Sequence, residues 1–136
     1  MKTKHPESAM QQSFIDACWR HPVARRIYAI PNGGKRSRIE AAIMKAEGVK
    51  AGMPDTHLPV ARGGCNGLYI ELKCGTNKPS PDQEQRITEL AEEGHAVAVV
   101  WDDWHLCWDL VQRYLAGEVG PGVQRIKPTK AKAVRQ

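Results

Sequence analysis

Three ionisable residues at short spacings form the chemically most informative part of the sequence. Asp55 follows a proline at the head of a half-polar stretch, and Glu71 and Lys73 lie two residues apart in the next alternating stretch. Side chains on a strand alternate between its faces, so a hairpin through the glycine-bearing turn would bring all three to one side. Two carboxylates and an ammonium group together are costly unless a divalent cation lies between the carboxylates. This combination is typical of a magnesium-dependent site that hydrolyses phosphodiesters.

The order of these residues also resembles a known family pattern. Pro54-Asp55, a gap of fifteen residues and Glu71-Leu72-Lys73 resemble the motif of the PD-(D/E)XK nuclease superfamily. Within that superfamily, residues 47–55, residues 69–73 and the segment Ser80-Pro81-Asp82-Gln83 resemble the small VRR-NUC (virus-type replication-repair nuclease) domain. The resemblance covers about residues 6–115. It implies a restriction-endonuclease-like α/β core, in which helices flank a small mixed central β-sheet.

The residue chemistry and the resemblance together suggest roles for the central residues. Carboxylates are hard oxygen ligands, so Asp55 and Glu71 suit a Mg²⁺ or Mn²⁺ cofactor. The resemblance implies the backbone carbonyl of Leu72 as a third metal ligand. Lys73 would orient or deprotonate the attacking water and stabilise developing negative charge, and its protonation state stays open. The predicted catalytic centre therefore consists of Asp55, Glu71 and Lys73.

The resemblance adds three polar side chains to the predicted site. Glu7 and Gln11 match the Glu-x-x-x-Gln opening of VRR-NUC domains, which implies that Glu7 is catalytic and that Gln11 contacts DNA. From the residues alone, Glu7 would be an N-terminal charge that favours the helix dipole. Gln83 is catalytic by resemblance, whereas its own position predicts a capping-box partner of Ser80.

A basic cluster precedes one predicted helix. Lys35, Arg36 and Arg38 lie where backbone N–H groups and side-chain charge can hold a phosphate, so we predict DNA contacts there, with a solvated basic loop as the alternative. The nearby glycines do not complete a nucleotide-binding loop, because its first glycine is absent and Arg36 replaces the hydroxyl residue, and no nucleotide cofactor is expected. His57 shares the predicted face of Asp55 and is a candidate for metal contact, for DNA contact or for the cleft wall.

The elements that must position these residues follow from periodicity and end signals. Apolar residues at helical spacing, caps and glycine stops predict helices over residues 7–20, 37–47, 80–93 and 103–116. Alternating or continuous apolar stretches predict strands over residues 23–30, 54–60, 68–73 and 95–101. Trp104 and Trp108 share an apolar stripe with Val111 and Leu115, which favours core or dimer packing over base stacking.

Composition restricts the class of protein. The 136 residues carry a formal charge of +5, and we predict a nuclease domain over residues 6–116 and a basic, flexible tail over residues 117–136. The tail has five basic residues against Glu118, a net +4, which suits a polyanionic partner such as DNA or simply a solvated tail. The longest apolar run, residues 96–101, is too short to cross a membrane, and no secretory signal is visible. We therefore expect a cytoplasmic protein, and the resemblance implies a bacterial or phage-infected host cell.

These observations converge on one functional expectation, a metal-dependent endonuclease that hydrolyses DNA. The resemblance implies selectivity for branched or Holliday-junction-like DNA in phage replication or repair. Cutting both strands needs two centres, so a homodimer is expected. One alternative is a nuclease-like fold that binds nucleic acid without cutting it. Another is a structural zinc protein, although its four cysteines lack the usual ligand spacing.

Overall fold

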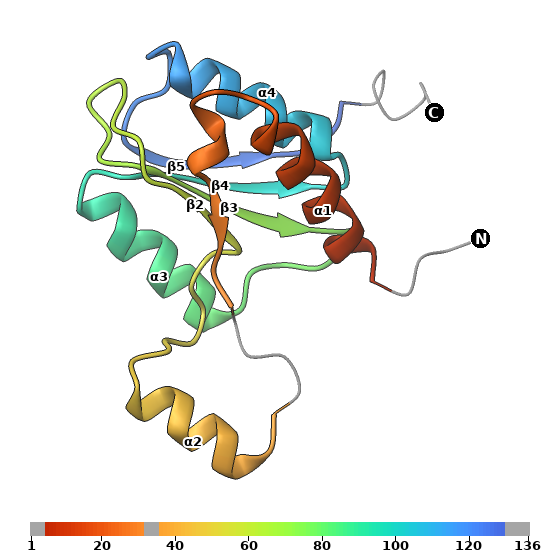
Figure 1. Cartoon of the computed structure of the whole chain (residues 1–136), viewed down its shortest axis with the longest axis vertical. Helices are drawn as coiled ribbons and strands as arrows, with labels where there is room; N and C mark the ends of the chain where they lie inside the picture. Colours follow the sequence, from red (N-terminus) through yellow and green to blue (C-terminus); the bar gives the residue numbers. More distant parts are fainter. Residues whose placement is uncertain (1–4, 32–35, 130–136) are drawn as a thin grey trace.

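A computed structural model describes residues 5–31 and 36–129 of the chain. Its centre is a mixed five-stranded sheet (Figure 1) in the order β1 (Tyr28–Ala29), β2 (Thr56–Leu58), β3 (Leu68–Lys73), β4 (Ala96–Trp101) and β5 (Gly122–Ile126). β1, β2 and β3 pair antiparallel, whereas β3, β4 and β5 are parallel. The carboxyl ends of β3, β4 and β5 therefore lie side by side at the same end of the sheet.

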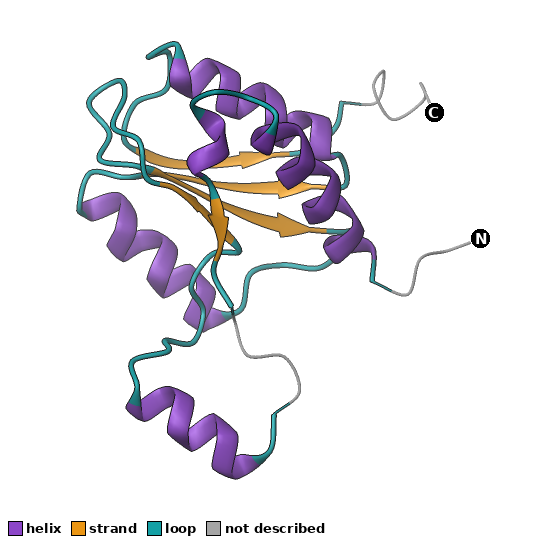
Figure 2. Cartoon of the chain, in the orientation of Figure 1, coloured by secondary structure: helices purple, strands orange, loops and turns teal. Residues whose placement is uncertain are grey.

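Helices cover both faces of the sheet (Figure 2). α1 (Pro6–Trp19) and α4 (Trp104–Leu115) pack together on one face, and α3 (Pro81–Glu92) lies on the other. A short 3-10 turn, η1 (Ala24–Arg26), connects α1 to β1. α2 (Arg38–Ala46) stands away from the sheet, and none of its residues is buried. The sheet and three of the helices thus enclose two apolar layers.

The alternation of β3 divides its side chains between these two layers. Leu68, Ile70 and Leu72 face the layer formed with α1 and α4, while Tyr69 faces the layer formed with α3. Glu71 shares the face of Tyr69 and is only 2% exposed. Each buried large apolar side chain stabilises the fold by about 1.5–3 kcal/mol, so the apolar neighbours on β3 offset the cost of burying this carboxyl group.

The helix starts predicted from caps are confirmed. Ser37 and Ser80 each accept a hydrogen bond from the backbone N–H three residues on, at Glu40 and Gln83. The side chains of Glu40 and Gln83 accept one from the cap N–H in return. These contacts involve only residues three positions apart, which is why local sequence predicts them.

The predicted strand over residues 23–30 is wrong for most of its length. The imidazole Nδ1 of His21 accepts hydrogen bonds from the backbone N–H groups of Val23 and Ala24, each at 3.1 Å. The backbone then makes the 3-10 turn, and only Tyr28–Ala29 pairs with β2. Apolar spacing carries no signal for such a side-chain contact, so the strand was overestimated.

The flexible tail predicted from residue 117 begins too early. Gly122–Ile126 forms β5, which pairs parallel with β4 at the edge of the sheet. Its residues alternate only between half-buried and exposed, so the apolar pattern that marks a strand is weak. Regular structure therefore extends to Ile126, while Lys130, Lys132 and Arg135 lie outside the described residues.

The packing predicted for two tryptophans of α4 agrees with the structure. Trp104 and Trp108 pack against the apolar layer that the sheet forms with α1 and α4, as expected for core residues. All four cysteines are free, and burial raises the pKa of the Cys18 thiol to about 12. Within residues 5–31 and 36–129, no helix has the length and apolar character needed to span a membrane.

Candidate active site

The start of β2 brings Asp55 against β3. Thr56 lies opposite Ile70 in the antiparallel pair, so the residue before it faces Glu71. The backbone N–H of Asp55 donates to Glu71 Oε1 at 3.1 Å, and the N–H of Leu72 donates to Asp55 Oδ2 at 2.8 Å. The two carboxyl groups are therefore direct neighbours, and backbone N–H groups hold both of them.

The Glu71 carboxylate is surrounded by donors as well as by Asp55. Its Oε2 accepts a hydrogen bond from Gln83 Nε2 at 2.7 Å and lies 3.2 Å from the ammonium nitrogen of Lys73. Only 2% of the Glu71 side chain and 11% of the Lys73 side chain are exposed. Charges attract more strongly in such a low-dielectric environment than in water. The structure thus brings together Asp55, Glu71 and Lys73.

Burial is the main cause that raises the pKa values of both carboxyl groups. Desolvation, followed by the charge of Asp55, raises the pKa of Glu71 to about 8, and desolvation also raises the pKa of Asp55. The pair therefore retains a proton near neutral pH unless a cation compensates its charge. A divalent cation would bind favourably in this environment, and the hard carboxylate oxygens fit Mg²⁺ or Mn²⁺.

The ligand set of such an ion would be small. In the described parts of the chain, no three His, Cys, Asp or Glu side chains gather closely enough to hold a metal by themselves. An ion at this pair would use the carboxylates of Asp55 and Glu71, the predicted carbonyl of Leu72 and water. Mg²⁺ suits that set because it keeps several of its waters. The alternative of a structural zinc site, which needs four protein ligands, gains no support.

The first helix adds two polar side chains next to the pair. Glu7 Oε2 accepts hydrogen bonds from the Cys74 N–H at 3.2 Å and from Asn77 Nδ2 at 3.1 Å, so it ties the segment after β3 to α1. The charge of Glu7 also raises the pKa of Asp55. Gln11, one helical turn on, lines the same groove as Asp55. Glu7 therefore does more than favour the helix dipole.

Gln83 caps the start of α3 and also contacts the carboxyl pair. Its Oε1 accepts a hydrogen bond from the Ser80 N–H at 2.8 Å, which completes the capping box, and its Nε2 donates to Glu71.

Gly52 allows the segment before β2 to approach the start of α3 closely. A Cβ at residue 52 would lie 2.6 Å from the backbone carbonyl carbon of Asp82, at a φ of +83°.

A groove of about 600 Å³ extends from the carboxyl pair along the first helix. We call it the α1 groove, and its walls include Glu7, Gln11, Ile15, Trp19 and Asp55. Because Asp55 lies in its wall, the groove gives solvent and larger molecules an open approach to Asp55.

Three other residues predicted to contact metal or DNA, namely His57, Arg36 and Arg38, lie apart from the pair. His57 Nδ1 is 2.6 Å from the hydroxyl of Tyr28, and its ring stacks on Tyr69 with centroids 4.2 Å apart. His57 therefore belongs to an aromatic cluster on the α3 face. Arg36 and Arg38 lie at the start of α2, away from the sheet, and Lys35 lies outside the described residues.

Comparison with known proteins identifies the family. A solved structure described as a VRR_NUC domain protein is similar to this chain, with 30% sequence identity and a TM-score of 0.72. The match covers 91% of this chain and 95% of the chain in that structure. This chain belongs to the VRR_NUC domain family. Neither a family model nor a curated protein matches the sequence. The VRR_NUC neighbour confirms the predicted family and the predicted α/β fold class.

Three residues that shape the VRR_NUC site were missed by sequence reasoning. Asn77 binds Glu7 through its side chain, and its carbonyl accepts a hydrogen bond from the indole of Trp101 at 2.9 Å. Gly52 packs against α3, and Trp19 lines the α1 groove. Each of these contacts joins segments far apart in the chain, so spacing along the sequence carried no signal for them.

Proposed function

We propose that this VRR_NUC domain is a Mg²⁺- or Mn²⁺-dependent endonuclease of the PD-(D/E)XK superfamily that hydrolyses DNA phosphodiesters. One observation carries the proposal. The residue directly before β2 and strand β3 hold the carboxyl groups of Asp55 and Glu71 together, with the Lys73 ammonium 3.2 Å from Glu71 Oε2. The name of the solved neighbour supports the nuclease class.

Asp55, Glu71 and the backbone carbonyl of Leu72 would hold the divalent ion. When bound, the ion supplies Lewis-acid stabilisation of phosphate oxygens and lowers the pKa of a water molecule. The two carboxyl groups act as ligands only when ionised. Glu71 must therefore give up the proton that its burial favours.

Lys73 would act on the attacking water and on the phosphate. Its Nζ orients the water or accepts its proton, and the ammonium form stabilises the negative charge that develops on the phosphate oxygens. The contact with Glu71 Oε2 keeps Nζ beside the carboxyl pair. Gln83 orients Glu71 from another direction, and Glu7 holds the segment that follows β3, so both position the reacting groups.

The proposal also covers the substrate and the assembly. We propose branched or Holliday-junction-like DNA as the preferred substrate, in phage replication or repair in the bacterial cytoplasm. Symmetric cutting of a junction needs two centres, which a two-fold homodimer supplies. Gln11, His57 and the basic residues Lys35, Arg36 and Arg38 are the proposed DNA contacts.

A cleavage panel tests the function. The purified protein is incubated with a four-way junction, a flap, a nicked duplex and a plain duplex, in the presence of Mg²⁺, Mn²⁺ or EDTA. We expect cleavage that requires the metal and favours the branched substrates. Intact DNA at high protein concentration, combined with tight and salt-sensitive binding, would establish the alternative of a module that binds DNA without cutting it.

The C-terminal end of β5 lies at the end of the sheet that carries the proposed site. β5 and β3 both run parallel to β4, so β5 terminates at the same end of the sheet as β3, whose last residue is Lys73. Just beyond β5, the Lys127 ammonium lies 4.8 Å from the ring centroid of Trp101. Basic residues after β5 therefore start close to where a bound phosphate backbone would lie.

Removal of residues 128–136 should weaken DNA binding and reduce its salt dependence. The segment carries Lys130, Lys132 and Arg135, and each lost phosphate contact lowers the slope of log affinity against log salt by roughly 0.9. Fluorescence anisotropy over a range of NaCl concentrations measures this slope. A full-length control with all three basic residues changed to glutamine separates charge from length. An unchanged slope in both proteins would exclude the segment from DNA binding.

A further inference from the structure

An exposed tryptophan lies in the wall of the α1 groove. Trp19, the last residue of α1, is 61% exposed. Its indole Nε1 donates a hydrogen bond to the backbone carbonyl of Ile27 at 3.2 Å, which holds the ring in one orientation. Single exposed apolar side chains are common on protein surfaces. An indole that is fixed in a groove wall, however, offers a rigid surface for stacking.

The α1 groove connects this indole to the proposed active site. Trp19 lies twelve residues after Glu7 on the same helix, which corresponds to roughly 18 Å along the helix axis. Glu7 and Asp55 line the groove near the carboxyl pair, and Gln11 lies between them and Trp19 on α1. Nucleotides stacked about 3.4 Å apart would reach the indole about five positions from the scissile phosphate.

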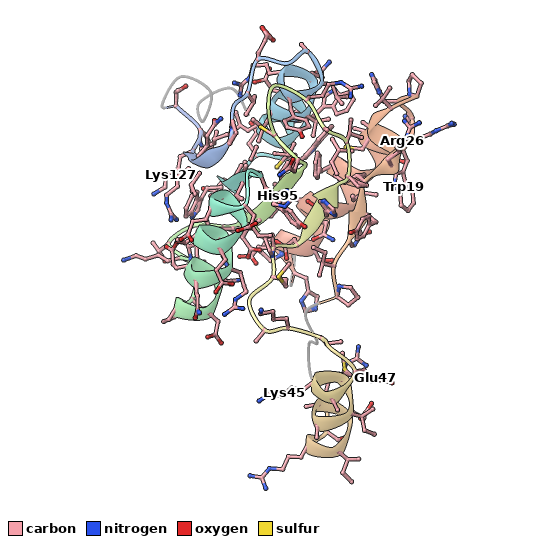
Figure 3. The ribbon with its side chains drawn as sticks, turned by 90° about the vertical axis from the view of Figure 1, so that its left-hand side faces the viewer. Trp19, Arg26, Lys45, Glu47, His95 and Lys127 are labelled. Atoms are coloured by element: carbon pink, nitrogen blue, oxygen red, sulfur yellow. The ribbon has the colours of Figure 1, made fainter. Side chains whose placement is uncertain are left out.

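Exposed arginines follow the tryptophan in the chain. The charged side chains that line the groove itself are Glu7, Asp16 and Asp55, whereas Arg20, Arg25 and Arg26 follow Trp19 in the chain and are exposed. Arg20 pairs with Asp16 at 3.0 Å, which reduces its free charge. Arg25 and Arg26 belong to η1, directly before the residue that accepts the indole hydrogen bond, and Figure 3 shows Trp19 and Arg26 projecting from the same edge of the molecule. Aromatic rings that stack on bases, next to cations that bind phosphates, are typical of single-strand binding sites.

We infer that Trp19 stacks on an unpaired base of the DNA substrate, with Arg25 and Arg26 binding the adjacent phosphates. Bases in an intact duplex are stacked on one another, so their faces are covered. A flap, a fork or a single-stranded gap beside the cut presents a free face. The inference rests on the proposed nuclease function and narrows its branched substrates to those with unpaired nucleotides beside the scissile phosphate, such as flaps and forks, in preference to a fully paired junction.

Binding to three DNA probes tests the inference without any cleavage. The probes share one duplex, which is either plain, or carries a short single-stranded flap, or carries the same flap built from abasic nucleotides. Fluorescence anisotropy in EDTA measures the affinity. The protein should bind the normal flap about tenfold more tightly than the abasic flap, which corresponds to about 1.4 kcal/mol. Because the abasic flap keeps its phosphates, this difference reports the bases alone.

Substitutions at Trp19 distinguish an aromatic face from apolar bulk. Trp19→Phe should keep most of the preference for the normal flap, whereas Trp19→Leu should bind both flaps equally. Val123→Ala removes another exposed apolar side chain, on β5, and should behave as the unchanged protein does. Thermal unfolding followed by circular dichroism checks that the variants fold. Equal affinity of the unchanged protein for both flaps, or an undiminished preference in Trp19→Leu, would overturn the inference.

The outcomes separate the stacking site from the nuclease function. A protein that cleaves DNA but shows no preference dependent on Trp19 refutes the stacking site alone. A protein that cleaves no DNA but keeps that preference refutes the nuclease proposal alone. If Trp19→Leu instead changes the sedimentation behaviour and not the flap preference, the indole is a protein contact and the inference is wrong.

Discussion

Asp55→Ala is expected to lower the rate of metal-dependent DNA cleavage at least roughly a hundredfold. Asp55 supplies one of the two carboxylates of the proposed ion site, and the Leu72 N–H holds it in place at 2.8 Å. Without this carboxylate, the site loses both a ligand and the negative charge that attracts the cation. Single-turnover cleavage of the best substrate from the panel measures the effect.

Two further variants separate lost chemistry from lost structure. Asp55→Asn keeps an acceptor for the Leu72 N–H but loses the charge, so it should be as inactive as Asp55→Ala. Asp109→Asn removes an exposed carboxylate on α4 that pairs with Arg113 at 3.0 Å, and it should cleave normally. The charge of Asp55 raises the pKa of Glu71, because the two carboxylates repel each other in the metal-free protein. Removing Asp55 removes this repulsion, so the substitution should not destabilise the metal-free protein through the carboxyl pair. Cleavage by Asp55→Ala at the unchanged rate would be fatal to the assignment.

The metal-free protein should lose roughly 4 kcal/mol of stability through Glu71 as the pH rises from about 4 to about 8. Burial, followed by the charge of Asp55, raises the folded-state pKa of Glu71 from 4.5 to about 8. The folded chain therefore binds this proton more tightly than the unfolded chain does. The resulting stabilisation is fully present below pH 4.5 and is lost as the pH rises through 8.

Urea unfolding of the unchanged protein and of Glu71→Gln over this pH range measures the contribution. The difference in unfolding free energy between the two proteins should fall with rising pH. Glu89→Gln is the control, because it alters a side chain on α3 that is 47% exposed. This variant should show the same dependence of unfolding free energy on pH as the unchanged protein. A difference that stays flat with pH would show that Glu71 is not a buried acid with a raised pKa.

The same experiment with Mg²⁺ examines the ion site. The cation binds the ionised pair, so it should restore stability at high pH in the unchanged protein and have little effect near pH 4.5. Glu71→Gln should gain little at any pH because it retains only one carboxylate of the pair. Equal stabilisation of both proteins by Mg²⁺ would place the ion elsewhere.

The predictability of the site differs from residue to residue. Glu71 and Lys73 could be assigned to one face because strand alternation is local, and Asp55 followed from a single turn. Gln83 could be assigned to a cap from its own neighbourhood, but its hydrogen bond to Glu71 depends on how α3 crosses the sheet. Trp19 lines the groove with Asp55 only because α1 lies beside the start of β2.

By itself, the sequence determined the elements whose signals are local: the alternating β3, the continuously apolar β4, and the helices capped by Ser37 and Ser80. The tertiary structure alone decided the short β1, the parallel pairing of β5 and the neighbours of the buried Glu71. The physical reason is that caps and periodicity involve residues a few positions apart. Edge-strand pairing and the contacts of a buried carboxyl group join distant segments, and their free energy depends on what the fold places opposite them.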